Sequence, residues 1–283
     1  MFKSTKVDIS KYHFSRYIES AMIIEPLDAG DIFEFIHLPQ MSEVLLLNFG
    51  NQISCESVGE SRECTFFTET TPYLCGKSDH TRIVQTKLEH PICLIKFKPC
   101  TFFIFSGESA KNYFNKIVPL TCNIDLSTTN PTEEMLMGFL SEHMKENYAD
   151  ELEQVNLFNI LEYIHANFTS ITVNELSRLF NKSKVTLFRY FQKYIGINLN
   201  TYIRYQKFKA MIVKLYRDQY DAITSIEHGF FDQSHFIKAF KKSYTYTPLQ
   251  FIRELESRFQ ENKESRELFE EFYIYDQIQY RDV

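Results

Sequence analysis

Large apolar residues and cations recur at helical spacing in two stretches of the chain that lie 49 residues apart. Residues 187–193 read Leu-Phe-Arg-Tyr-Phe-Gln-Lys, and residues 236–242 read Phe-Ile-Lys-Ala-Phe-Lys-Lys. Because a large apolar residue returns every four positions, each helix has one face that must be buried, with the cations on the opposite face. The pattern therefore predicts two similar helices, each with a basic surface suited to an acidic partner, and nucleic-acid phosphate is the leading candidate.

The residues before the first stretch predict a helix, a turn and a second helix. Thr172 and Glu175 form a capping box, which starts a helix that runs through about Phe180. After a short turn, Ser183 has the side chain to cap a helix over residues 184–195, and Gly196 ends it by tolerating a left-handed conformation.

The residues around the second stretch predict the same order of helix, turn and capped helix. A short helix is expected near residues 223–228, a turn at 229–231, and a helix from Gln233 to about Tyr244 with Asp232 as its N-cap. A longer helix over residues 199–217 separates the two stretches. Two helix-turn-helix units on one connecting helix follow from this order.

These motifs resemble the AraC/XylS family of bacterial transcription regulators over residues 156–253. The matching residues are Ser183, Leu187, Arg189, Phe191, Gly196, Tyr202-Ile203-Arg204, Gly229-Phe230, Asp232-Gln233-Ser234-His235-Phe236, Lys238, Phe240-Lys241-Lys242 and Thr247-Pro248. The chain departs from the family at five positions. Ser177 and Ser225 stand where the family has a small Ala, and Thr224 stands where it has an aliphatic residue. His228 takes the place of an apolar residue, and Thr245 that of a turn Gly.

The resemblance implies a sequence-specific DNA-binding transcription regulator, whose two recognition helices read successive major grooves of promoter or operator DNA. RNA polymerase is then an expected partner. Helical geometry together with the resemblance gives the expected DNA-contacting residues as Ser183, Lys184, Val185, Thr186, Phe188, Arg189, Lys193, Gln233, Ser234, Ile237, Lys238, Lys241 and Lys242.

Side-chain chemistry assigns roles to several of these residues. Arg189 suits a guanine edge, Gln233 an adenine edge, and Lys238 a guanine or a phosphate. The family resemblance also points to Val185 and Phe188, whose apolar side chains suit thymine methyls, although Phe188 has packing against a neighbouring helix as an equal alternative. Phosphate contacts or solvated charges are expected for Lys182, Arg204, Lys207 and Lys242.

The charge distribution agrees with a DNA-binding segment inside an acidic chain. Residues 156–253 carry 14 Lys and Arg against 6 Asp and Glu, a net charge of +8, whereas the whole chain has a net charge of −6. Residues 1–155 have a net charge of −9 and residues 254–283 a net charge of −5. Attraction to a polyanion requires this concentration of cations in one module.

The amino-terminal part has a different pattern, with short strand-like runs separated by turn residues. The predicted strands are 31–38, 43–49, 52–58, 64–69, 82–88, 92–97 and 101–105, and a helix is expected over 108–115. Strands at this spacing indicate a sandwich or small barrel. Such a domain, cupin-like by the resemblance, could sense a small-molecule effector, or could serve only for dimerisation or protein binding.

The whole chain is therefore expected to be a multi-domain α+β protein. The expected parts are a cupin-like β domain over 1–128, a linker helix over 129–154, a double helix-turn-helix domain over 155–254 and an acidic extension over 255–283. The linker helix is capped by Asn130, with Pro131 in its first turn. Its apolar stripe either packs on the β domain or forms a homodimer contact. An amphipathic helix over 264–275 or a frayed tail is expected in the extension.

Several functional classes lack their motifs. The histidines are too scattered for a metal-dependent cupin, and no nucleophile elbow or phosphate loop occurs, so we expect no enzyme, metal or cofactor. The six cysteines have no C-x-x-C spacing and are expected to fill the core. No signal peptide or membrane span is indicated, which predicts a cytoplasmic protein.

Overall fold

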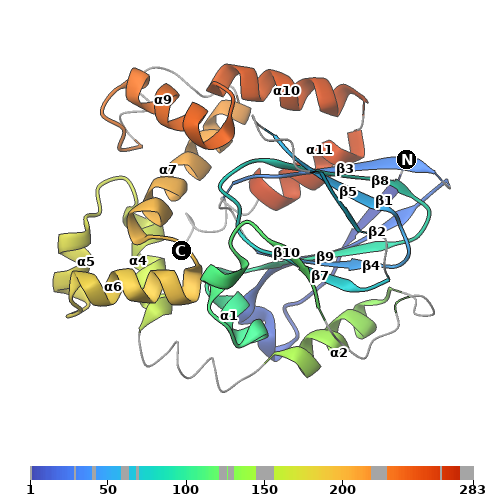
Figure 1. The fold of residues 1–283 in the computed structure, drawn as a ribbon, viewed down its shortest axis with the longest axis horizontal. Coiled ribbons are helices and arrows are strands. Elements are labelled where there is room, and N and C mark those ends of the chain that lie inside the picture. The colour runs from blue at the N-terminus through green and yellow to red at the C-terminus, as the bar shows by residue number, and fades with distance from the viewer. Residues whose placement is uncertain are drawn as a thin grey trace.

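The computed structural model describes a β-rich amino-terminal region beside a helical carboxyl-terminal region (Figure 1). The described residues are 2–28, 30–39, 43–58, 64–67, 70–120, 126, 131–144, 156–217, 228–261 and 263–274. This arrangement confirms the predicted fold class.

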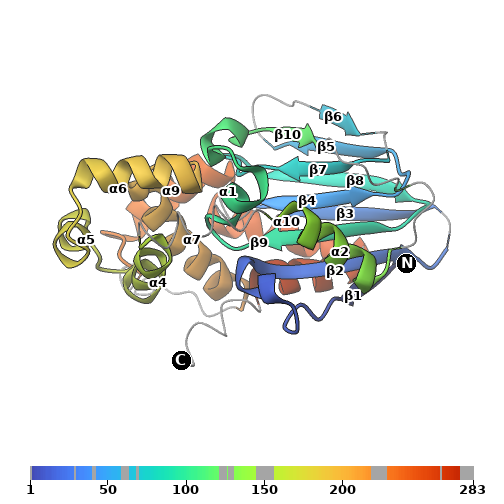
Figure 2. The ribbon, with the colours of Figure 1, turned by 90° about the horizontal axis from the view of Figure 1, so that it is seen from below.

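Two antiparallel sheets make up the amino-terminal region (Figures 1 and 2). The larger sheet has the order β1-β2-β9-β4-β7-β10 and the smaller the order β3-β8-β5-β6. The strands are β1 (Phe2–Lys6), β2 (Ile18–Pro26), β3 (Asp31–His37), β4 (Val44–Asn48), β5 (Ile53–Ser57), β6 (Cys64–Phe67), β7 (Pro72–Cys75), β8 (Arg82–Leu88), β9 (Ile92–Phe97) and β10 (Ile117–Pro119).

Six predicted strands are present, and one is wrong. Residues 101–105 form a helix, α1 (Thr101–Ser106), which Gly107 ends in a left-handed conformation. The run Thr-Phe-Phe-Ile-Phe is buried throughout, so it has no period that separates helix from strand. The expected helix over 108–115 is the short 3-10 helix η2 (Ala110–Tyr113).

Helix α2 (Glu133–His143) covers the outer face of the larger sheet (Figure 2). Its N-cap is Thr132, whose hydroxyl accepts a hydrogen bond from the Met135 amide, and the predicted cap Asn130 lies outside the described residues. Leu136 and Leu140 are fully buried against the β domain. The apolar stripe is thus covered within one chain, and a homodimer contact there remains a prediction.

The helical region begins with α4 (Leu157–Asn167) and contains the first predicted helix pair and the second helix of the other pair. Further along the chain are α5 (Val173–Leu179), α6 (Lys184–Tyr190), the π-helical turn η3 (Phe191–Ile195), α7 (Leu199–Tyr216), α9 (Gln233–Tyr244) and α10 (Pro248–Glu261). The predicted helix at 223–228 lies outside the described residues except for His228. Helix α10 runs across the predicted domain boundary at residue 254.

The acidic extension contains helix α11 (Lys263–Phe269) and the π-helical turn η4 (Glu270–Ile274), so the predicted amphipathic helix is present. Helix α11 packs on β1 and β3, which are the edge strands of the two sheets. Phe272 and Tyr273 are buried, and the Tyr273 hydroxyl accepts a hydrogen bond from the Leu38 amide. The extension therefore closes one edge of the sandwich, where unpaired strands need cover.

The core consists of two hydrophobic clusters. The first joins the outer face of the larger sheet and α2 to α4 and the first helix-turn-helix unit, through residues such as Phe97 and Phe191. The second joins the space between the sheets to the second unit and the extension, through residues such as Phe35 and Phe240. The connecting helix α7 contributes to both clusters.

Candidate nucleic-acid interface

Local hydrogen bonds hold the first unit, and one of them, from the Glu175 amide to Thr172, belongs to the predicted capping box. The Thr172 hydroxyl accepts from the Glu175 amide at 3.2 Å, and the Glu175 carboxylate accepts from the Tyr163 hydroxyl at 3.0 Å. This second bond raises the pKa of Tyr163. Ser177 donates to the Lys182 carbonyl at 2.7 Å, so the serine that departs from the family pattern stabilises the turn between the two helices.

Helix α6 begins with Ser183, whose hydroxyl accepts from the Thr186 amide at 3.1 Å and lies 2.9 Å from the Thr186 hydroxyl. Two predicted DNA-contacting residues therefore also form the cap, which satisfies otherwise unpaired amides at the helix start. In helix-turn-helix proteins that bind DNA, the start of the second helix is the part that approaches base edges.

Leu187 and Phe191 were predicted to be buried, and Lys184, Val185 and Arg189 to be exposed, and the structure agrees. Leu187 and Phe191 are fully buried, whereas Val185 is 76% exposed and Arg189 is also exposed. Lys184 is exposed beside Val185. Phe188 is half-buried against the first cluster, which favours the packing alternative for this residue.

The last turn of the first recognition helix meets the β domain. The Lys193 ammonium lies over the rings of Phe103 and Tyr194, at 5.0 and 4.8 Å from their centroids, and Ser109 donates to the Lys193 carbonyl. A side chain on Gly196 would come within 2.9 Å of the Ala110 carbonyl oxygen, so this glycine is required for close approach as well as for its φ of 83°. The structure thus places Lys193 at the domain contact rather than on the open face.

The second unit has an equivalent cap and a more aromatic core. The Asp232 carboxylate accepts from the His235 amide at 2.7 Å. Phe236 and Phe240 are fully buried, and Phe240 lies 4.4 Å from Tyr244 and 5.8 Å from Phe208 between ring centroids. Helix α9 is therefore anchored on α7 by aromatic packing.

The outer face of α9 carries most of the residues predicted for it. Gln233, Ser234, Lys238, Lys241 and Lys242 are exposed. Ile237, in contrast, is half-buried against the second cluster. The exposed set is polar or cationic, as a surface for phosphates and base edges requires.

Phe231 is a feature that the sequence interpretation missed. It directly precedes the cap of α9 and is 86% exposed, whereas its neighbour Phe230 is buried. The sequence contained a signal for this exposure, because consecutive side chains in a turn point in different directions and only one of the two phenylalanines can face the core. An exposed aromatic side chain at the start of a recognition helix adds apolar surface to the polar face.

Two residues near the second unit have structural roles. Lys207 donates to the Gly229 carbonyl at 3.0 Å, and burial lowers the pKa of its ammonium. Its role as a phosphate contact or solvated charge stays a prediction. Thr245 adopts a left-handed φ of 70° where the family has Gly, and its hydroxyl donates to the Val58 carbonyl of the β domain. The strained backbone conformation of Thr245 therefore lies at a contact between the two domains.

His165 on α4 supports the connecting helix. Its Nε2 lies 2.6 Å from the Tyr202 hydroxyl. Burial lowers the pKa of His165 to about 4, and the nearby Lys209 ammonium contributes to this shift. The imidazole is therefore neutral at pH 7.

A cavity of about 310 Å³ lies between the β domain and α4. The β domain contributes Arg16, Tyr17, Lys98 and Pro99, and α4 contributes Phe158, Leu161, Glu162 and His165. This size and mixture of aromatic and charged walls are typical of a small-molecule site at a domain interface.

Other kinds of site have less support in the described ranges. There, His, Cys, Asp and Glu side chains do not gather in groups of three that fit a metal ion. Each helix of the described part is too short or too polar to cross a bilayer. Cys55, Cys75, Cys93 and Cys100 are free thiols, of which Cys75 is half-buried and the others are buried.

Comparison with known proteins supports the helix-turn-helix interpretation. A family model described as a helix-turn-helix domain matches residues 176–254. The chain is 25% identical over 176 residues to the Msm operon regulatory protein of Streptococcus mutans, in a match that covers 55% of this chain and 60% of that protein. The chain thus spans less than two thirds of that relative.

The solved structures that resemble the chain do so weakly. ToxT from Vibrio cholerae gives a TM-score of 0.42 at 12% identity, with 89% of this chain and 97% of ToxT covered. The AraC-like transcriptional activator CuxR gives a TM-score of 0.24 at 12% identity, with 81% of this chain and 91% of CuxR covered. At these values the likeness carries no conclusion about function.

Proposed function

Because residues 176–254 form a helix-turn-helix domain of the AraC type, we propose that the chain is a transcription regulator whose two recognition helices, α6 and α9, read successive major grooves of one DNA site. The observation that carries this proposal is the repeated geometry of the two helices. Each is capped by a side chain at its start, buried along one side and exposed with cations on the other.

The two helices divide the proposed readout. Arg189 on α6 and Lys238 on α9 are exposed cations at corresponding positions of the repeat. Arg189 is assigned to a guanine edge and Lys238 to a guanine or a phosphate, while Gln233 is assigned to an adenine edge. Val185 and Phe231 add exposed apolar surface, which suits thymine methyls.

The salt dependence of DNA binding by the full chain tests this function. If about six phosphates are neutralised, the slope of log affinity against log salt is near −5. Lys241→Ala reduces the magnitude of this slope by about one. Lys3→Ala, which removes an exposed cation of β1, leaves it unchanged. A slope near zero for the wild-type chain contradicts DNA binding through these helices.

We also propose that the β domain senses a small-molecule effector. Support comes from the 310 Å³ cavity, because its walls belong to both the β domain and α4 of the DNA-binding domain. An occupant would contact both domains and so bias their arrangement. In the alternative, the β domain is a dimerisation or protein-interaction module without a ligand.

A small-molecule library separates these alternatives when thermal unfolding of the full chain is measured. A compound that raises the melting temperature of the wild type and of Lys3→Ala, but not of Lys98→Ala, supports the cavity as the effector site. If no compound acts and the chain dimerises with concentration, the interaction module is favoured. Contacts with RNA polymerase and a cytoplasmic location remain predictions.

A further inference from the structure

Arg82 places a cation inside the sandwich. In the strand register it lies opposite His37 of β3 and Ser57 of β5, and Val84, two residues along β8, lies opposite Phe35 and Cys55. Since residues two apart share a face of a strand, Arg82 points into the space between the sheets. Only 5% of Arg82 is exposed, and it lines a cavity of about 20 Å³.

The guanidinium lacks the partner that other buried cations have. In the described part of the chain, the buried cations Lys77 and Lys96 pair with the carboxylates of Glu43 and Glu19, respectively. Arg82 pairs with no carboxylate of the described residues, and its Nη1 atom has no hydrogen-bond partner there. A guanidinium keeps its proton in proteins, so it cannot relieve burial by becoming neutral. An uncompensated buried charge of this kind is costly.

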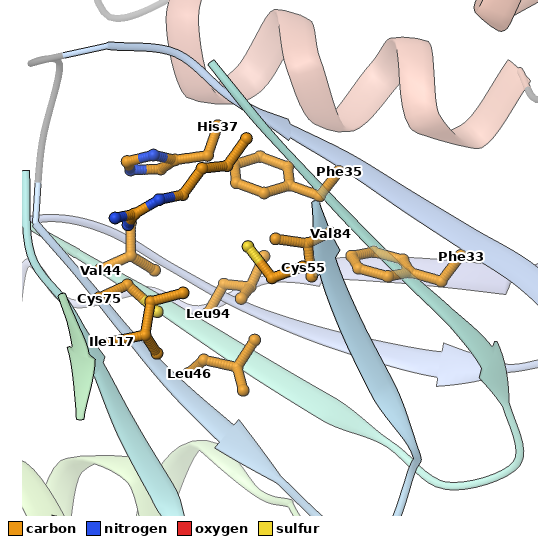
Figure 3. Close-up of a pocket in the computed structure, with 11 residues that line it drawn as sticks. Phe33, Phe35, His37, Val44, Leu46, Cys55, Cys75, Val84, Leu94 and Ile117 are labelled. Carbon is orange, nitrogen blue, oxygen red and sulfur yellow. The ribbon is translucent and has the colours of Figure 1, made fainter. Parts of the chain in front are cut away.

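The remaining walls of the cavity offer Arg82 no negative charge. Figure 3 shows side chains of the two sheets facing each other across it, among them Phe35, Val84, Leu94 and Ile117. Apart from the His37 imidazole and the Cys75 thiol, the residues that line the cavity beside Arg82 are apolar. The thiol of Cys75 stays protonated because burial raises its pKa to about 12. Within the described residues, the charge of Arg82 is therefore not matched by a carboxylate.

We propose that Arg82 binds a small monovalent oxyanion inside the β-sandwich, of the size of formate or nitrite. The planar guanidinium matches such an anion with two parallel hydrogen bonds. The volume sets the size, since one water needs about 10–15 Å³ measured in the same way. A single charge balances Arg82, and a chain of several carbons exceeds the space.

The cavity is linked to the carboxyl-terminal extension through Phe35. Phe35 forms part of its wall and packs on Phe272 of η4, with 4.9 Å between ring centroids, and on Tyr273. Residues 263–274 follow α10 in the chain, so an anion beside Arg82 acts on the segment that connects the sandwich to the second helix-turn-helix unit. This site goes beyond the proposed function and requires neither DNA binding nor the cavity between the domains.

Thermal unfolding of the full chain in a series of sodium salts tests the site, at constant pH and ionic strength. Formate and nitrite raise the melting temperature by roughly 5 °C at a concentration 100-fold above the Kd, and the rise continues with the logarithm of the anion concentration. The effect declines through acetate and is absent for butyrate, which is too large. If all these salts act alike, or none acts, a water molecule suffices beside Arg82 and the proposal is overturned.

Arg82→Met removes the charge while keeping a long side chain. The variant loses the response to formate and nitrite, whereas Arg253→Met, which removes an exposed guanidinium of α10, keeps it. An unchanged response in Arg82→Met overturns the assignment of Arg82. If Arg82→Met does not fold, calorimetric titration of the wild-type chain with formate decides: saturation at one anion per chain supports the site, and no saturable heat overturns it.

Discussion

The two helix-turn-helix units repeat one sequence pattern but rest on different supports. The first unit contacts the β domain directly, through the bond from Ser109 to the Lys193 carbonyl and the packing of Phe103 on Tyr194. The second unit is supported chiefly through α10 and α11, where Arg258 and Ser265 both bond to Glu34. The repeat therefore determines each local unit, while segments outside the repeat determine how each is attached.

The largest expected effect comes from the aromatic anchors of the two units. Phe191→Ala and Phe240→Ala each lower the free energy of unfolding by about 3–5 kcal/mol, because both side chains are fully buried and the truncation leaves a cavity. Denaturant unfolding measures the loss, and hydrogen exchange locates it. Since the two residues belong to separate clusters, amide protection falls in α6 for Phe191→Ala and in α9 for Phe240→Ala.

Equal loss of protection in both helices for both variants contradicts this comparison. It indicates instead that α7, which contributes to both clusters, merges them into one cooperative core. Loss of less than about 1 kcal/mol in either variant shows that the helix is not anchored through that side chain.

A smaller effect distinguishes the readout of the two helices. Arg189→Ala and Lys238→Ala each weaken DNA binding by about 1–3 kcal/mol and relax base preference at separate positions, about 10 base pairs apart. Binding selection from a randomised DNA pool measures both the preference and the spacing. Lys111→Ala, on the exposed surface of η2, is the control and leaves the selected site unchanged. Uniform weakening on all sequences shows that the two cations contact only phosphates.

The smallest effect concerns pH and the first unit. The pKa of His165 is about 4 in the folded chain and about 6.5 when unfolded, so the unfolded state binds more protons between these values. The contribution of neutral His165 is fully present above pH 6.5 and is lost as the pH falls towards 4. Because the residue is only half-buried, we expect about 1–2 kcal/mol rather than the full value.

The measurement compares the unfolding free energy of the wild type with that of His165→Gln from pH 7.5 to 4. Glutamine retains a hydrogen-bonding group towards Tyr202 but does not titrate in this range. The difference between the two proteins narrows or reverses in the acid range. An identical pH response in both means that His165 does not sense the buried environment of the first unit.

Local features of the helical region could be predicted because nearby residues determine them. Ser183 and Asp232 cap helices at the predicted positions, and the buried stripes of Phe191 and Phe240 follow from helical spacing. The run at 101–105 could not be assigned, since it is buried on every side and shows no periodicity. Four strands of the larger sheet, β1, β2, β7 and β10, were not predicted. No strand was expected before Asp31, and β7 and β10 are short runs that each contain a proline, which is unfavourable within a sheet.

In the candidate site, too, local positions could be predicted but contacts with distant segments could not. Arg189 and Lys238 are exposed as their helical positions predict. The ammonium of Lys193 lies over a ring of the β domain, and that of Lys207 donates to the Gly229 carbonyl. Helical position alone does not indicate either contact. Sequence spacing assigns a residue to one side of a helix, but it does not show which segment covers that side.

The closure of the sandwich by α11 and η4 has a consequence for the order of folding. Lys6 of β1 and Glu271 form an ion pair although they lie 265 residues apart in the chain. A ribosome must therefore synthesise almost the whole chain before the edge formed by β1 and β3 receives its cover, and such distant contacts form slowly. Until then Phe35 lacks Phe272 and Tyr273, so the nascent β domain presents an apolar edge that is prone to aggregation and is a natural substrate for chaperones.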